Sequence, residues 1–339
     1  MRRIAGHASS LAVVLTAAVV SGGFTSGCNN QPTSAPAAAA TTAPPDLAPP
    51  ALSTGSPVSV GSAAASAAAP AAPPSPADAV AAGVACGALG CRLFDTPAAA
   101  FRVILDSKPL IIAMGEAHAQ KGTEAIPSSA KRFTTDLLPL LEGRSSDLLV
   151  EIMAPPKGCK ATTEQVRTKQ KVVTEKQADT NQSEYVIMGN EAKARHIVPD
   201  LLRPTCADLD AIDKAGPDAV AASLAAIARL TKDQVARLLD RNTRAGADKI
   251  VATYGGAIHN DLAPPPERAA WSFGPDLSAR VSGRYVAVDM FVPEFIQDTE
   301  TWRKLEWYPH FDRTKHPDKT TLFNPSPGSY VLIFPKTPR

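Results

Sequence analysis

Short, largely apolar runs recur along the chain from residue 110 onward, separated by longer segments of mixed polarity. The runs lie at residues 110–114, 148–152, 249–254, 285–291 and 330–334. Runs of this length with few polar positions are typical of strands that are buried on both faces of a sheet. The pattern therefore predicts a sheet that is covered by other elements on both sides.

The segments between these strands carry helix signals. Thr96 followed by Pro97 is an N-cap with proline at the first helical position, and Pro109 stops the helix that they begin. Thr231 and Gln234 form a capping box that we expect to start a new helix. Helices are thus predicted over 97–107, 127–141, 182–195, 217–230 and 231–244. The type of residues 197–208 stays open. Helices that alternate with short apolar strands predict an α/β fold, with a largely parallel sheet sandwiched by helices.

Residues 31–80 differ from the rest of the chain in composition. They contain 18 Ala and 11 Pro, two charged residues and no aromatic residue. Such a segment cannot bury enough apolar surface to offset its chain entropy. We therefore expect a disordered Ala/Pro-rich linker over 28–83, followed by one globular domain over 84–339.

Residues 1–27 have the three-part layout of a secretory signal peptide. Arg2 and Arg3 give a basic start, residues 11–20 form an apolar run, and small residues follow. The run is too short to span a bilayer in the mature protein. The leader therefore predicts export.

The leader ends in Thr25-Ser26-Gly27-Cys28, which resembles the lipobox of bacterial lipoproteins. The resemblance implies that Cys28 is diacylated and becomes the new N-terminus, so that the lipid holds the domain at a membrane, facing the periplasm or the cell exterior. The family usually has Leu at the position of Thr25, and secretion without lipidation is the alternative. A tether that starts directly after Cys28 favours the lipoprotein.

The four remaining cysteines are Cys86, Cys91, Cys159 and Cys206. In an exported protein an even number of cysteines predicts disulfides, and three pairings are possible. We favour Cys86 with Cys91 and Cys159 with Cys206, because the second pair brackets the polar, Lys-rich residues 157–179. A zinc site is the alternative, but the chain has no Cys-x-x-Cys pair and no His close in sequence to these cysteines.

The charge balance limits the class of partner. The chain has 35 basic and 33 acidic residues, for a net charge of +2, and no basic stripe of the kind that follows a phosphate backbone. We therefore expect no nucleic-acid partner.

Candidate chemistry lies just after the predicted strands. Glu116 and His118 follow the first strand, Glu151 closes the second, and His259 follows the strand over 249–254. Ligands of open α/β sheets bind outside the carboxyl ends of the strands, so these four side chains are expected to converge. Imidazole and carboxylate together are the ligands of catalytic divalent metal sites.

Two of these segments resemble known motifs. Gly115-x-x-His118 and Gly256-x-x-His259 resemble the paired Gly-x-x-His motifs of the Tiki/TraB proteins. With Glu116, the first motif also resembles the Gly-Glu-x-His opening of ChaN-like haem-uptake proteins. Erythromycin esterases, in the same broad superfamily, begin with a related Gly-Glu-x-x-His. The resemblance implies an α/β sandwich in a group that includes metal-dependent proteases, haem-binding lipoproteins and esterases.

The resemblance covers about residues 110–289 and also implies roles for single residues. His118 and His259 match the motif histidines, Glu116 matches the motif acid of the ChaN and esterase branches, and Glu151 falls where these families place a strand-end acid. Since the superfamily hosts several functions, the match indicates the location of the site better than its activity.

Two functions follow as hypotheses. The first is a metal-dependent hydrolase, a peptidase or esterase, in which His118 and His259 bind a divalent ion, Glu151 completes the site and Glu116 is the general base. The second is a surface lipoprotein that binds haem or iron without catalysis. An aromatic content of 5% weakens the haem hypothesis, whereas the lipid anchor favours it. The ligand is therefore expected to be a small molecule, a peptide or haem.

Replacing Cys28 by Ser tests the anchor. The variant should leave the membrane fraction, because the thiol that would carry the diacyl group is missing. Cell fractionation followed by immunoblotting measures the distribution. A Cys28→Ser protein that loses its leader yet stays in the membrane fraction would rule the lipid anchor out.

Overall fold

The computed structural model describes residues 83–338, and the predicted signal peptide, Cys28 and nearly all of the predicted linker lie outside this range. Within it the chain has an α/β fold built on a nine-stranded mixed sheet. The strands are β1 (Val84–Ala85), β2 (Arg92–Phe94), β3 (Ile111–Glu116), β4 (Ser145–Met153), β5 (Val198–Leu202), β6 (Ile250–Gly256), β7 (Tyr285–Phe291), β8 (Thr320–Ser326) and β9 (Ser329–Ile333).

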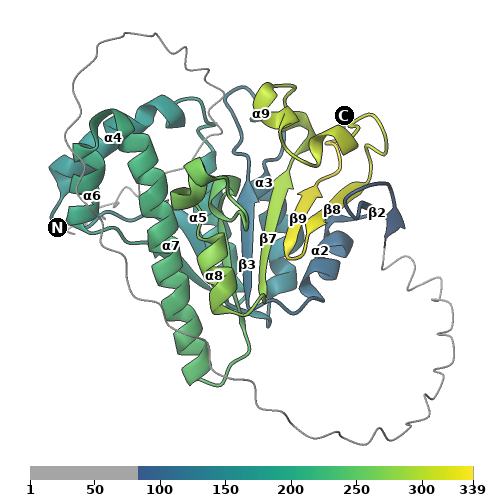
Figure 1. Cartoon of the computed structure of the whole chain (residues 1–339), viewed down its shortest axis with the longest axis horizontal. Helices are drawn as coiled ribbons and strands as arrows, with labels where there is room; N and C mark the ends of the chain where they lie inside the picture. Colours follow the sequence, from purple (N-terminus) through teal and green to yellow (C-terminus); the bar gives the residue numbers. More distant parts are fainter. Residues whose placement is uncertain (1–82, 339) are drawn as a thin grey trace, which may run out of the picture. The chain divides into compact units, whose positions relative to one another are not determined.

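The strands are arranged in the order β1-β2-β8-β9-β7-β3-β6-β4-β5. The part from β2 through β8, β9 and β7 to β3 is labelled in Figure 1. Strands β9, β7, β3, β6, β4 and β5 run parallel to one another, while β8, β2 and β1 extend the sheet antiparallel beyond β9. The predicted α/β fold with a largely parallel sheet is therefore confirmed. Each of the five apolar runs of the sequence forms one of the parallel strands, namely β3, β4, β6, β7 and β9.

Helices cover both faces of the sheet (Figure 1). They are α2 (Pro97–Leu105), α3 (Ser129–Arg132), α4 (Lys160–Thr174), α5 (Asn181–Ala194), α6 (Cys206–Lys214), α7 (Ala219–Arg244), α8 (Gly274–Arg280) and α9 (Glu300–Arg303). Successive side chains of a strand point to opposite faces. Ile112 and Met114 of β3 pack with α2, α3 and α5, whereas Ile111 and Ala113 pack with α7 and α8.

The predicted break at residue 231 is not present. Thr231 and Gln234 lie inside α7, a single helix of 26 residues, and both are buried. The Gln234 side chain donates a hydrogen bond to Asp200 of β5, so a polar pattern that indicates a cap serves a tertiary contact instead. Despite the length of α7, none of the helices between residues 83 and 338 is long and apolar enough to cross a membrane.

Two other segments differ in detail from the expectation. Residues 127–141 form α3 and then a π-helical turn over Phe133–Leu137 and a 3-10 turn over Leu138–Leu141. Pro139 lies in the last turn, where a residue without an N–H cannot extend an α-helix. The segment 197–208, left open by the sequence, contains β5 and the start of α6, which begins at a capping box formed by Thr205 and Asp208.

Both preferred disulfides are present, Cys86–Cys91 and Cys159–Cys206. The second joins the start of α4 to the start of α6. Around it the two helices and α7 enclose a small apolar cluster of their own, made of Cys159, Val166, Leu209, Ile212 and Ala219. The Lys-rich segment therefore belongs to a helical unit beside the sheet, made of α4, α6 and the start of α7 and held together by this disulfide. We refer to it as the stapled helical unit.

Replacing Cys159 and Cys206 together by Ala should lower the free energy of unfolding by about 4 kcal/mol, because the bond closes a loop with a sequence separation of 47. Cys86→Ala with Cys91→Ala is the matched control, and its loop with a separation of 5 predicts a loss of about 2 kcal/mol. Denaturant unfolding followed by circular dichroism measures both losses. Equal losses would contradict the loop-length explanation.

Candidate functional site

A row of four positions crosses the carboxyl ends of the central strands. Gly115 of β3 lies opposite Gly255 of β6 and, on its other side, opposite Asp289 of β7. Glu151 of β4 comes one residue after a pair in register with β6, and its carboxyl group lies against Gly255. By strand alternation all four face α7 and α8, so the row has a carboxylic acid at each end and two glycines between them.

Both positions require glycine, because neighbouring atoms lie too close to the backbone there for a side chain to fit. A Cβ at Gly255 would overlap the Glu151 carboxylate, and a Cβ at Gly115 would overlap the Ala257 backbone and lie 2.8 Å from Asn260 Nδ2. The absence of a side chain at these two positions is what lets Glu151 and the chain after β6 lie on the sheet.

Glu116 points to the opposite face, toward α5. Its carboxylate accepts hydrogen bonds from Tyr185 (2.8 Å) and Tyr254 (2.6 Å), and it lies 2.7 Å from His118 Nδ1. Burial and the Glu116 charge raise the pKa of both tyrosines well above its usual range, so they stay protonated donors. The carboxylate therefore holds the Nδ1–H tautomer of His118, which leaves the Nε2 lone pair free.

His259 is held in the same tautomer by a different partner. Its Nδ1 lies 2.7 Å from the Trp271 carbonyl oxygen, which can only accept, so Nδ1 carries the hydrogen. Burial lowers the pKa of His259 to about 4; the Trp271 carbonyl opposes this shift and the charge of His118 adds to it. The imidazole is therefore neutral at physiological pH, and its Nε2 is 3.7 Å from Glu151 Oε1.

Glu151 is fixed by one oxygen only. The backbone N–H of Gly256 donates to Glu151 Oε2 at 2.7 Å. Burial raises the pKa of Glu151 to about 8; the Gly256 hydrogen bond opposes this shift and the charge of Glu116 adds to it. The group thus holds a proton at neutral pH when no cation is beside it.

The structure brings the four predicted residues together as two pairs, Glu116 with His118 and Glu151 with His259. Each of the four is at most 5% exposed. The pKa of His259 responds to His118, and that of Glu151 responds to Glu116, so the pairs lie within range of each other's charge. Between residues 83 and 338, however, no three His, Cys, Asp or Glu side chains are grouped as the ligands of one metal ion.

Three atoms of the two pairs are buried without a hydrogen-bond partner: His118 Nε2, His259 Nε2 and Glu151 Oε1. Buried polar atoms without a partner are costly, and a bound ligand, ion or water would offset that cost. A cavity of about 10 Å³, enough for a single water molecule, is bordered by Glu151, His259 and Asn260.

The connection between α4 and α5 packs against the residues that follow His118. Ala178 N–H and the Asn181 side chain both donate to the Ala119 carbonyl, at 2.9 and 3.1 Å, and Lys121 N–H donates to Lys176. The stapled helical unit is thus hydrogen-bonded to the loop that carries His118.

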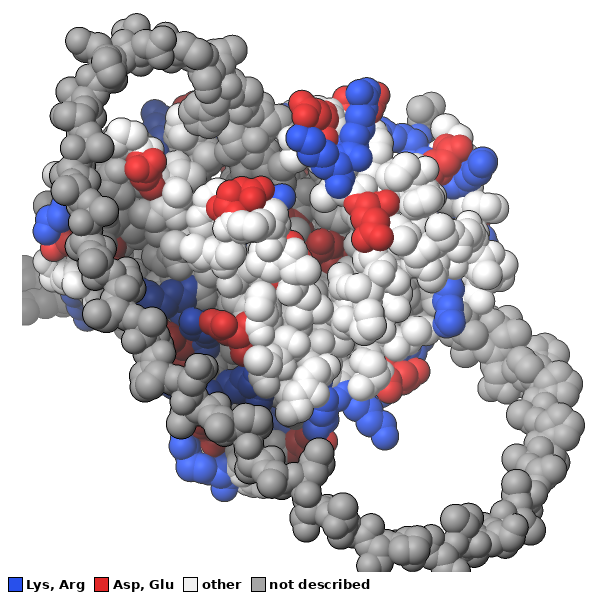
Figure 2. Space-filling model, viewed as in Figure 1, with Lys and Arg blue, Asp and Glu red and all other residues white. Residues whose placement is uncertain are grey.

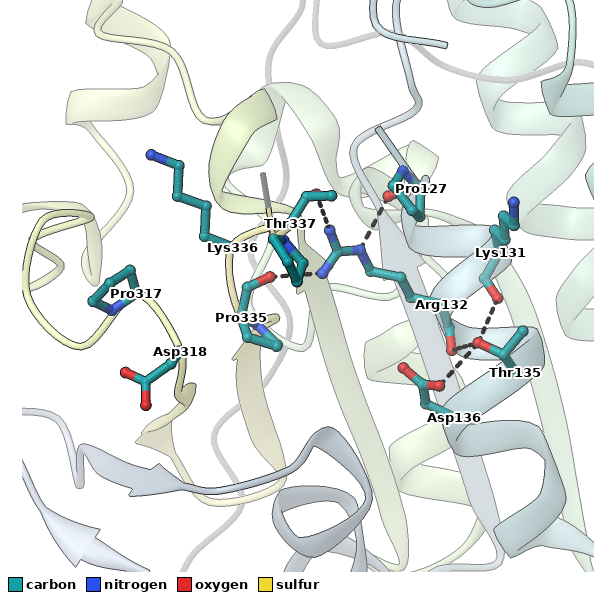
Figure 3. A pocket seen from close by; sticks show the side chains of 11 residues that line it. Pro127, Lys131, Arg132, Thr135, Asp136, Pro317, Asp318, Pro335, Lys336 and Thr337 are labelled. Carbon is teal, nitrogen blue, oxygen red and sulfur yellow. Dashed lines mark hydrogen bonds between the residues drawn. The ribbon is translucent and has the colours of Figure 1, made fainter. Parts of the chain in front are cut away.

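A larger hollow, of about 640 Å³, lies elsewhere and contains none of the candidate residues (Figure 3). At its floor the Arg132 guanidinium donates to Pro127 (3.0 Å), Pro335 (2.6 Å) and Thr337 (2.8 Å). The bonds to Pro335 and Thr337 therefore hold the C-terminal segment against α3, so this guanidinium is engaged by the chain itself.

Figure 2 shows how the charged side chains are distributed over one face of the molecule. Basic and acidic side chains are interspersed there around a largely uncharged centre.

Sequence reasoning missed four residues around the site, namely Tyr185, Tyr254, Asn260 and Asp289. Tyr254 and Asn260 adjoin the second Gly-x-x-His motif, and position alone could have indicated them. Asp289 is the one carboxylate in an otherwise apolar strand run, which is a signal that could have found it. Tyr185 has no signal, because only the fold brings α5 to the end of β3.

Comparisons with protein-family models, curated proteins and solved structures gave no match to this chain. Evidence on function therefore comes from the side chains of the site themselves.

Gly255→Ala should displace the Glu151 carboxylate and lower the free energy of unfolding by about 1–3 kcal/mol, as overpacked cores do. Gly158→Ala is the matched control, since nothing lies within 4 Å of a Cβ there, and it should be close to neutral. Thermal and denaturant unfolding measure both. A Gly255→Ala protein as stable as the control would show that the carboxyl group is not held on the sheet.

Proposed function

We propose that this chain is an exported, lipid-anchored hydrolase whose site is formed by Glu116, His118, Glu151 and His259 and takes a divalent metal ion. The observation that carries the proposal is the set of three buried atoms without partners, two imidazole nitrogens and one carboxylate oxygen. The two disulfides are consistent with export.

The positioning of the histidines supports a metal ion. Metal-binding histidines almost always donate the other ring N–H to a carboxylate or a backbone carbonyl. Here His118 has Glu116 in that role, and His259 has the Trp271 carbonyl. The donor set therefore fits a divalent ion chemically, with His118, His259 and Glu151 as ligands. Because these atoms are not already grouped around one point, binding requires side-chain movement.

When bound, such an ion would polarise the scissile carbonyl group and lower the pKa of water. The chain's own residues orient the ligand groups of the site and, because they are buried, exclude bulk water from it. Both oxygens of Glu116 accept hydrogen bonds, so in this proposal Glu116 positions His118 and is not the general base. Glu151, with Oε1 free, is the carboxyl group that can release its proton when a cation arrives.

A small ion is favoured over haem. The cavity of about 10 Å³ next to Glu151 and His259 holds one water molecule, whereas a haem needs a space many times larger. We therefore rank the haem-binding alternative second.

His118→Ala and His259→Ala should each lose the bound metal and the hydrolysis of p-nitrophenyl acetate or a casein peptide, because each removes one ligand atom. Glu116→Gln keeps both histidines but loosens His118, and should weaken metal affinity by about 10- to 100-fold. Metal content of the detergent-purified chain is measured by plasma mass spectrometry.

His310→Ala is the matched control, since His310 is exposed, and it should keep its metal and activity. A wild-type chain that binds no metal and hydrolyses neither ester nor peptide would refute the proposed function. So would unchanged metal content in both histidine variants.

A further inference from the structure

Asp289 is a carboxylate in an apolar strand, and it lies at a boundary between two apolar clusters. Ala287, two residues before it, belongs to the cluster beneath α7 and α8. Phe291, two residues after it, belongs to a separate cluster with Trp302 and Trp307. Asp289 itself is partly exposed, while its neighbours on the same face are buried. Part of the Asp289 residue is therefore open to solvent at this boundary, although its Oδ1 atom is buried.

Asn260 lies beside Asp289 and is nearly fully buried. Its side chain lies against the Asp289 carboxylate, and its amide nitrogen donates to the Ala113 carbonyl at 3.1 Å. Asp289 Oδ1 and Asn260 Oδ1 are both buried without a hydrogen-bond partner. Each of these two residues therefore has one buried acceptor left for a ligand that donates hydrogen bonds.

Charge around Asp289 is acidic. The charge of Asp261 acts on it, and the Tyr285 hydroxyl, which also lies near, donates to the Asn260 carbonyl at 2.8 Å. Among residues 83–338 no Lys, Arg or His forms an ion pair with Asp289. Burial raises the pKa of Asp289 to about 7; the Asn260 hydrogen bond opposes this shift and the charge of Asp261 adds to it. A cation beside the carboxylate would remove that penalty.

The two acceptors adjoin the candidate site. Asn260 follows His259 directly, and its amide lies over Gly115, the glycine opposite Asp289. The pair is thus at one end of the row of four positions, and Glu151 is at the other.

We propose that Asp289 and Asn260 form a subsite that binds a primary ammonium group of the substrate. An ammonium supplies the donors that both acceptors lack and the positive charge that the carboxylate lacks. The proposal rests on the proposed hydrolase site for the identity of the ligand as substrate. The substrate class is then an ester or amide that carries a free amine near the bond to be cleaved.

The test measures binding separately from hydrolysis. n-Butylammonium is titrated into the detergent-purified full chain by calorimetry, with 1-butanol and butyrate as uncharged and anionic probes of equal length. The wild type should bind n-butylammonium more tightly than either. Asp289→Asn keeps the shape and removes the charge, and should weaken this binding at least about tenfold. Asn260→Ala should weaken it as well.

Asp106→Asn is the matched control, because Asp106 is exposed and is not among the charges that act on Asp289, and its binding should stay near the wild-type value. His118→Ala should keep ammonium binding even where it abolishes hydrolysis, which separates this proposal from the proposed function. Equal binding of butanol and butylammonium by the wild type would overturn the subsite. Unchanged affinity in a folded Asp289→Asn protein, as judged by its melting temperature, would overturn it too.

Discussion

Close approach of polar side chains to bare backbone at two glycines is the constraint on which the site depends. Gly115 and Gly255 face each other across β3 and β6, and the volume that side chains would fill there holds the Asn260 amide and the Glu151 carboxyl group. A carboxyl group that lies on the sheet is removed from water, which disfavours its charged form. The proton on Glu151 is therefore a result of packing against Gly255.

The site also joins the two faces of the sheet. Alternation along the strands points Glu116 toward α5 and Glu151 toward α7, so the sheet would separate the two acids anywhere but at its edge. At that edge the chain after β3 carries His118 and the chain after β6 carries His259, each fixed by a partner on its own side. A site built in this way needs both layers of helices to be in place before it exists.

Much of the fold could be predicted from the local sequence pattern, because buried parallel strands appear in the sequence as short apolar runs. The error at Thr231 arose because polar residues inside a helix can serve a tertiary contact, and local sequence does not distinguish that from a cap. The Gly-x-x-His motifs predicted which side chains would lie close together for a similar reason: their residues adjoin strand ends. Tyr185 could not be predicted, because its contact with Glu116 spans 69 residues of sequence and depends on where α5 packs.

The position of β9 has a consequence for the order in which the protein can fold. This strand is the last in the chain, yet it lies inside the sheet, between β7 and β8, and the N-terminal strands β1 and β2 reach the sheet only through β8. During synthesis this edge of β7 therefore stays unpaired until β9 has emerged. A nascent chain exposes an apolar strand edge for that interval, and unpaired edges of this kind are prone to aggregation.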